Sequence, residues 1–100
     1  MGVLVVSYPA EPGNRFDPDY YLTTHLPLVE QHWGGKGMTD ARPLIGGAGP
    51  AGRLAAMVLI DFAPGTAIDA LLGDPASAPV FADVANFTDI APVAHIFPDA

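Results

Sequence analysis

The chain contains no cysteine and few basic residues. The missing cysteine excludes a disulfide framework, a thiolate nucleophile and a cysteine-ligated metal or iron–sulfur site. Only four Lys and Arg residues stand against eleven Asp and Glu, a formal net charge of −7. Such a charge repels a phosphate backbone or an anionic membrane, so we expect neither nucleic acid nor membrane as a partner. The first apolar run ends at Ser7 after about four residues, too short for a signal peptide or a membrane span, and we expect a cytoplasmic protein.

The length and the apolar content together predict a single domain, residues 1–100, that associates with itself. A chain of this size should bury roughly 60 to 70% of the surface that it exposes when unfolded. Half of the residues are hydrophobic and only 15% are charged, which indicates more apolar surface than a small monomer can hide. A homodimer is the simplest way to cover it.

Proline, glycine and the apolar patterns divide the chain into strands and helices. We expect a first strand at 3–8, closed by Pro9, and then a helix from 18 that ends at Gly34–Gly35. Two strands follow, at 41–48 and 53–62. After them we expect a helix at 67–72 with a proline-interrupted helical piece from 74 towards 83, and a last strand within 86–97 that is broken at Pro92. The order β-α-β-β-α-β predicts an α+β, ferredoxin-like fold, with a four-stranded antiparallel sheet and two helices on one face.

Two of the strands indicate that the other sheet face also needs cover. Residues 3–8 and 53–62 are apolar at consecutive positions instead of alternating with polar residues. A second copy of the sheet would cover that face, so we expect a homodimer formed through the sheet, a dimeric α/β barrel.

Capping residues mark the helix starts. Asp17 is a suitable N-cap, Pro18 occupies the first helical position, and Phe16 is placed to pack on Tyr21 as a hydrophobic staple. Thr66 and Asp69 form a capping-box pattern before the second helical region.

Histidine and proline share the first helix in an unusual way. At about 100° per residue, Pro27 falls on the wet side, where water can solvate the carbonyl that it frees. A kink there would open space near His25, which lies near the middle of the apolar arc. The members of that arc, which should face the sheet, are Leu28, Tyr21, His32, His25, Val29, Leu22, Trp33 and Leu26.

Three interpretations of His25 remain open. It is either a core histidine that hydrogen-bonds Tyr21 or a strand side chain, a metal ligand, or an acid, base or polarising group in an apolar pocket. Seven residues of helix separate His25 from His32 by roughly 10 Å, too far to share an ion. We therefore expect no metal and no cofactor.

Other side chains are weaker candidates. Tyr21 could orient His25, donate to a ligand oxygen, or serve only as the staple. His95 should share a strand face with Asp89 if Pro92 leaves the register unchanged. The predicted ligand-binding residues are Leu22, Leu28, Val29, His32, Trp33, Phe87 and Asp89.

Two stretches resemble the EthD family. "FDPDYYLTTHLPL" is similar to its Phe-Asp-x-x-Tyr-Tyr-x-x-x-His-x-Pro-Leu signature, and "DVANFTD" at 83–89 is similar to its acidic, Asn-Phe-containing stretch before the last strand. The motif falls on Phe16, Asp17, Tyr20, Tyr21, His25, Pro27 and Leu28. The resemblance implies a ferredoxin-like fold paired as a dimeric barrel, a link to ether-degradation gene clusters, and relatives that act on aromatic, polyketide-like compounds.

Two hypotheses follow. The first is a dimer that binds an apolar or aromatic oxygenated compound between sheet and helices, with cofactor-independent proton transfer, oxidation or decarboxylation at His25. The second is a non-catalytic accessory or ligand-binding subunit of a degradative or biosynthetic pathway, whose histidine only binds a ligand or locks the core.

Overall fold

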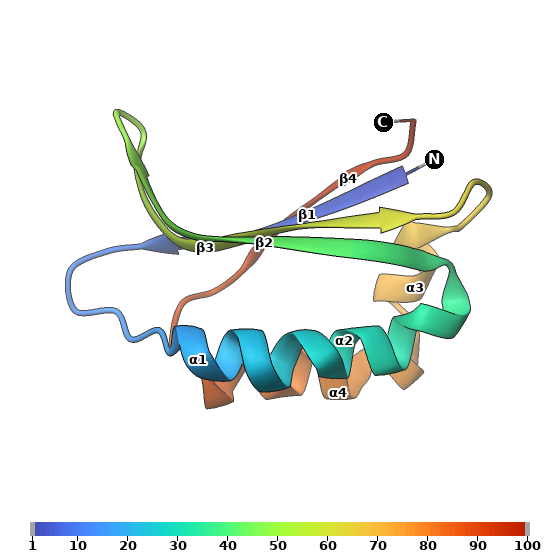
Figure 1. Cartoon of the computed structure of the whole chain (residues 1–100), viewed down its shortest axis with the longest axis horizontal. Coiled ribbons are helices and arrows are strands. Elements are labelled where there is room, and N and C mark those ends of the chain that lie inside the picture. Colours follow the sequence, from blue (N-terminus) through green and yellow to red (C-terminus); the bar gives the residue numbers. More distant parts are fainter. Residues whose placement is uncertain (1, 100) are drawn as a thin grey trace.

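A computed structural model describes residues 2–99 as a sheet with one helical layer. Four antiparallel strands form the sheet in the order β2-β3-β1-β4. All the helices lie on one side of it (Figure 1). The strands are β1 (Gly2–Ala10), β2 (Met38–Gly49), β3 (Gly52–Phe62) and β4 (Val93–Phe97). This arrangement confirms the predicted α+β, ferredoxin-like fold.

The helical layer is built from one long and one interrupted helical segment. The long segment consists of α1 (Pro18–Tyr20), the π-helical η1 (Tyr21–His25), α2 (Leu26–Trp33) and the 3-10 turn η2 (Gly34–Lys36). The second consists of α3 (Ile68–Leu72), η3 (Pro75–Ser77), α4 (Ala78–Ala82) and η4 (Asp83–Asn86), of which η3 and η4 are 3-10 turns. Within residues 2–99, none of these helices has the length and apolar character needed to cross a membrane.

The start of the long segment is capped as predicted. The Asp17 carboxylate accepts a hydrogen bond from the Tyr20 amide at 3.1 Å, and Pro18 occupies the first turn. The rings of Phe16 and Tyr21 lie 5.3 Å apart between centroids, which confirms the hydrophobic staple. The staple fixes how the chain enters the helix and places Tyr21 on the side of the sheet.

A π-helical turn precedes Pro27, where we expected a simple kink. A proline at this position has no amide hydrogen, and its ring crowds the carbonyl of Thr23. The turn before it is π-helical, and the Leu26 amide donates to the Tyr21 carbonyl five residues back. This wider turn alters the angular spacing of the residues that follow it. As a result Tyr21, His25, Val29 and Trp33, each four residues after the last, are all buried.

The second helical segment differs from the prediction at its start and its end. The capping box is wrong, because the Thr66 hydroxyl donates to the Ala63 carbonyl at 2.8 Å and the N-cap position is Ala67, which offers no side-chain acceptor. Asp74 caps the next turn by accepting from the Ala76 amide at 2.9 Å. The helical turns then continue beyond Asp83 to Asn86.

The strand bounds differ from the prediction near the prolines. Pro9 does not close β1; a register shift between Tyr8 and Pro9 accommodates it, and the strand continues to Ala10. The last strand is shorter than expected, since it begins at Val93, directly after Pro92. Asp89 lies before this strand, so the predicted strand face shared by Asp89 and His95 does not form.

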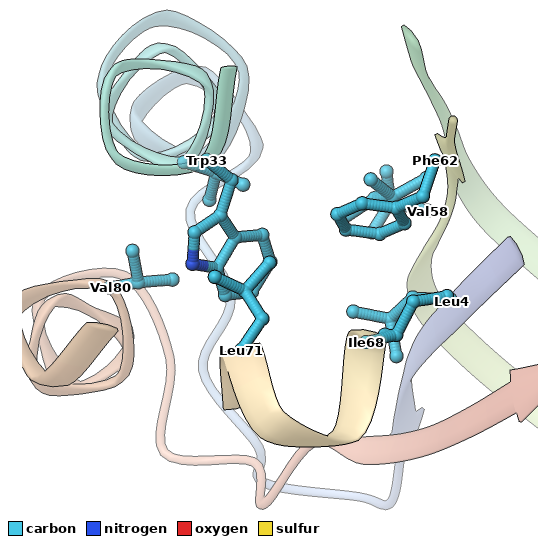
Figure 2. Packing of buried hydrophobic residues seen from close by; sticks show 9 residues of the cluster. Leu4, Trp33, Val58, Phe62, Ile68, Leu71 and Val80 are labelled. Carbon is cyan, nitrogen blue, oxygen red and sulfur yellow. The ribbon is translucent and has the colours of Figure 1, made fainter. Parts of the chain in front are cut away.

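The core fills the space between the sheet and the helices. Trp33 extends from α2 towards Leu71 of α3 and Val80 of α4, with Phe62 and Val58 of β3 on the sheet side (Figure 2). The Trp33 indole N–H donates to the Ser77 hydroxyl at 2.9 Å, and that hydroxyl donates to the Leu71 carbonyl at 2.8 Å. These bonds tie both helical segments to one another and leave no polar atom of this pair unsatisfied.

Candidate functional site

A cavity of about 260 Å³ lies between the long helix and the sheet. Its volume is just below the range usual for sites that hold drug-sized ligands. Among the described residues that line it, only Tyr8, Tyr21, His25 and Trp33 carry polar side-chain atoms. The apolar lining residues are Leu4, Val6, Leu26, Val29, Val58, Ile60, Leu72, Val80, Phe81, Val84, Pro92 and Ala94.

His25 is the titratable group at this cavity with a charged partner. It is 4% exposed, and its Nδ1 atom lies 3.0 Å from Oδ2 of Asp83, which begins η4. The π-helical turn brings the imidazole to the side of the helix that faces η4. The expected partners, Tyr21 or a strand side chain, are therefore replaced by a carboxylate from the second helical segment.

Two further side chains hold Asp83 in place. The Tyr20 hydroxyl donates to Asp83 Oδ1 at 2.7 Å, and the Asn86 side-chain amide donates to the same oxygen at 2.9 Å. The other carboxylate oxygen remains for His25. Because three donors converge on it, the carboxylate has a fixed position from which it can orient the imidazole.

The pKa shifts of the pair indicate a neutral histidine beside a carboxylate. Burial raises the pKa of Asp83, but the hydrogen bonds from Asn86, Tyr20 and His25 outweigh this effect and bring the pKa below its ordinary value. Burial lowers the pKa of His25 and outweighs the opposite effect of the Asp83 hydrogen bond and charge. An ionised carboxylate can only accept, so we assign the proton of the neutral imidazole to Nδ1. The lone pair of Nε2 is then available at neutral pH.

Tyr21 is a buried hydroxyl without a partner. Within residues 2–99 its oxygen accepts and donates no hydrogen bond, although the residue is fully buried. Leaving such a group unsatisfied costs about 1–3 kcal/mol. Burial and then the proximity of Tyr8 raise the pKa of Tyr21. The predicted role of Tyr21 in orienting His25 through a hydrogen bond is corrected: Asp83 makes that bond, and the Tyr21 ring only stacks on the imidazole, with centroids 5.9 Å apart.

Four of the predicted site residues meet at the cavity. Tyr21, His25, Val29 and Trp33 all line it. Trp33 contributes only its ring surface, because its N–H is bound to Ser77. These residues follow one another at intervals of four, and this spacing places all of them on the face of the helix that lines the cavity.

Leu22, Leu28 and His32 do not line this cavity, which corrects their place on the helical wheel. Leu22 is 39% exposed, and His32 Nδ1 lies 3.0 Å from the Leu28 carbonyl oxygen on its own helix. The wheel assumed a uniform turn, whereas the π-helical turn changes the spacing of the face. His25 and His32 therefore do not share one pocket.

Phe87 and Asp89 also lie outside the cavity lining. Phe87 is fully buried and packs against the His25 ring, with centroids 4.6 Å apart. Asp89 is exposed, and its carboxylate accepts from the Arg15 amide at 2.9 Å and the Asn14 side chain at 3.2 Å. Asp89 thus fastens the loop before the long helix to the segment before β4.

Three residues of the site were not among the predicted site residues. Asp83 and Asn86 lie within the quoted stretch "DVANFTD", and Tyr20 lies within "FDPDYY", but nothing in their spacing shows that they meet. His95, whose role was left open, is exposed on β4 and lies away from the cavity. Across residues 2–99 no group of three or more His, Asp and Glu side chains is arranged to hold a metal ion.

Solved structures show where this fold and sequence belong. An EthD-like protein from Ralstonia eutropha JMP134 is 31% identical to the chain, with a TM-score of 0.78 over 95% of this chain and 88% of that one. The chain belongs to the EthD-like family. No protein-family model matches it, and no curated protein matches it.

Two more distant structures share the fold of this EthD-like protein. One is an ethyl tert-butyl ether D (EthD) family protein from Bacillus halodurans C-125, with 15% identity and a TM-score of 0.59 over 93% of this chain and 96% of that one. The other is a protein of unknown function from Nitrosomonas europaea, with 21% identity and a TM-score of 0.52 over 95% and 84%. At these identities the similarity is one of fold alone.

Proposed function

We propose that this EthD-like protein binds an apolar, oxygenated small molecule in the cavity beneath the sheet and that His25 takes a proton from it. The observation that supports this most is the buried imidazole at an apolar cavity, held through Nδ1 by Asp83. A general base needs a free lone pair, a fixed orientation and a pKa near the working pH. His25 Nε2 has the free lone pair and the fixed orientation, and burial lowers the pKa of His25, which keeps the imidazole in its neutral, proton-accepting form.

The surroundings of His25 favour proton transfer over other chemistry. The lining of the cavity is mostly apolar, so a hydrogen bond between Nε2 and a bound ligand is stronger there than in solution. The carboxylate of Asp83 stabilises the imidazolium that forms when Nε2 receives the proton. Proton transfer needs no further group, whereas the oxidation and decarboxylation considered from the sequence each require additional steps.

The binding experiment compares two ligands that differ by one hydroxyl group. We expect the protein to bind 2-naphthol about tenfold more tightly than naphthalene, because the phenol donates to Nε2, as one hydrogen bond allows. The His25→Gln variant should lose this preference. His32→Gln is the matched control, since His32 lies on the same helix and outside the cavity. Isothermal titration calorimetry measures both affinities.

The result of this comparison shows whether His25 contacts the ligand or serves only the core. Equal affinity for both ligands in the wild type, or an unchanged preference in His25→Gln, would show that His25 is a structural residue of the core. A preference for 2-naphthol that depends on His25 is expected of a base and of a ligand-binding subunit alike, and a measurement of proton exchange on a bound ligand distinguishes the two.

We also propose that two copies pair through the uncovered sheet face. Residues opposite one another in adjacent strands share this face, and Val5 lies between Leu59 of β3 and His95 of β4. On the same face Leu44, Val93 and Phe97 are 47%, 39% and 50% exposed. The helices cover only the opposite face (Figure 1). A second sheet would remove this apolar surface from water.

Light scattering after size-exclusion chromatography tests the pairing. The wild type should elute as a dimer at micromolar concentration, and Leu59→Glu should be monomeric because it places a charge in the buried face. Gln31→Glu, on the exposed side of α2, should leave the dimer intact. A monomeric wild type would contradict the proposed pairing.

A further inference from the structure

Three of the residues that line the cavity are exposed to solvent. They are Phe81 of α4, Pro92 in the segment before β4 and Ala94 within β4. Phe81 is 45% exposed, whereas the other described residues of the lining, apart from these three, are buried or half-buried. The cavity therefore comes closest to solvent between α4 and the start of β4. We call this place the mouth of the cavity.

A groove on the surface adjoins the mouth. Phe81, Val84 and Pro92 line both the cavity and this groove, so these side chains form the boundary between the two spaces. All three are apolar, as is Ala94. A ligand that passes between them meets no charged side chain of the mouth, which favours uncharged, apolar ligands.

The chain on each side of the mouth is fixed, so the Phe81 side chain determines how wide the mouth is. On the α4 side, Val80 is buried in the core beside Trp33 (Figure 2). On the β4 side, Ile90 is buried and its amide donates to the Thr88 hydroxyl at 3.0 Å. These contacts hold the backbone that leads into the mouth from both helical layer and sheet.

The inner side of the Phe81 ring packs against Trp33. The two rings meet edge to face, with centroids 6.3 Å apart and 62° between their planes. The Trp33 indole is held by its hydrogen bond to Ser77, whereas Phe81 has no polar atom and is half exposed. Exposed side chains change rotamer within nanoseconds. Phe81 can therefore turn outward into the groove while Trp33 stays in place.

We propose that ligands enter and leave the cavity through this mouth and that Phe81 controls which of them pass. The inference rests on the proposed function, because the passage leads to His25. The mouth also lies near that residue, since Asp83, its hydrogen-bonding partner, directly precedes Val84. Phe81 is thereby assigned a role in ligand selection and none in proton transfer.

Stopped-flow fluorescence of 2-naphthol measures the passage. Phe81→Ala should raise both the association and the dissociation rate about tenfold, because a smaller side chain leaves the mouth open. Ile45→Ala is the matched control. Ile45 is also 45% exposed, and it lines neither the cavity nor the groove, so this variant should keep the wild-type rates.

The absence of cysteine from the chain allows a second test. In Phe81→Cys the introduced thiol is the only one, so a bulky maleimide attaches there alone. This label should slow the association of 2-naphthol about tenfold, and the same label on Pro92→Cys, across the mouth, should also slow it. A label on Ile45→Cys should leave the rate unchanged. All three variants should fold, because each replaces an exposed side chain.

The outcomes distinguish this inference from the proposed function. Wild-type association rates in both labelled mouth variants would overturn the entrance. If the wild type still prefers 2-naphthol through His25, the proposed function would then stand with its entrance elsewhere. Slowed association in the labelled variants with unchanged rates in Phe81→Ala would overturn the control by Phe81. A wild type that does not bind 2-naphthol would overturn both the inference and the proposed function.

Discussion

His25 Nδ1 lies 3.0 Å from Asp83 Oδ2, although 58 residues separate them in the chain. The first residue belongs to the π-helical turn before Pro27, and the second begins the last helical turn before β4. The contact joins the two halves of the helical layer at the cavity. It also determines which nitrogen of the imidazole remains free for a ligand.

Replacing Asp83 by Asn should weaken the site without removing the histidine. The amide is uncharged and has only one acceptor oxygen, so it cannot serve Tyr20, Asn86 and His25 as the carboxylate does. We expect a loss of about 1–3 kcal/mol in the free energy of unfolding. Without the charge that raises it, the pKa of His25 should fall still further. Chemical denaturation and an NMR titration of the His25 ring measure the two effects.

Asp19→Asn is the control for this substitution, because Asp19 is exposed in the first turn of the same helical segment. It should change neither the His25 titration nor the preference for 2-naphthol. A higher pKa of His25 in Asp83→Asn would mean that Asp83 does not act on the imidazole as the structure indicates.

Substituting Pro27 by Ala should raise the free energy of unfolding and weaken the preference for 2-naphthol. Alanine restores an amide donor and removes the ring that crowds Thr23, which should raise the free energy of unfolding by up to about 3 kcal/mol. A regular helix would turn His25 away from Asp83, so the preference for 2-naphthol should fall. Gln31→Ala, at an exposed position of the same helix, controls for a general gain in helix stability. A stabilised Pro27→Ala with an unchanged preference would show that the π-helical turn does not position His25.

The lowered pKa of His25 makes stability depend on pH in a defined direction. The pKa of histidine in the unfolded chain is about 6.5, and that of His25 in the folded protein is lower. Below pH 6.5 the unfolded chain therefore binds a proton that the folded protein does not bind, so the free energy of unfolding should fall as the pH falls from 6.5 towards the folded pKa. The pKa of Asp83 in the folded protein also lies below its ordinary value of 3.8, so the free energy of unfolding should fall further when the pH falls below 3.8. Urea unfolding at pH 7.5 and 5.5 should therefore show a decrease that is smaller in His25→Gln. An increase towards pH 5.5 in the wild type would indicate that the pair is stabilised as an ion pair with a charged histidine.

Much of the fold can be predicted from the sequence, because its signals are local. Asp17, Pro18 and the Phe16–Tyr21 staple define the start of the long helix, and both its cap and its staple form as predicted. The alternation of strands and helices determines the topology. Burial of His25 also follows from its place on the apolar arc.

The errors arise where a local pattern competes with a neighbour in space. Thr66 fits the sequence pattern of a capping box, but its hydroxyl donates a hydrogen bond to the Ala63 carbonyl and does not cap the helix. Pro27 widens a turn, and this moves His32 off the face on which a uniform wheel places it. Asp83 could not be predicted as the partner of His25, because their contact depends on how the two helical segments pack and on no periodicity within either one.

We propose that His25 acts as a neutral base with its proton on Nδ1. A long-range proton–nitrogen NMR correlation of the imidazole ring at pH 7 tests it most directly, with His25→Gln to assign the signals. We expect a protonated Nδ1 and an unprotonated Nε2 in the wild type, and a mixture of the two tautomers in Asp83→Asn. A doubly protonated ring at pH 7, or a proton on Nε2 with a bare Nδ1, would contradict it.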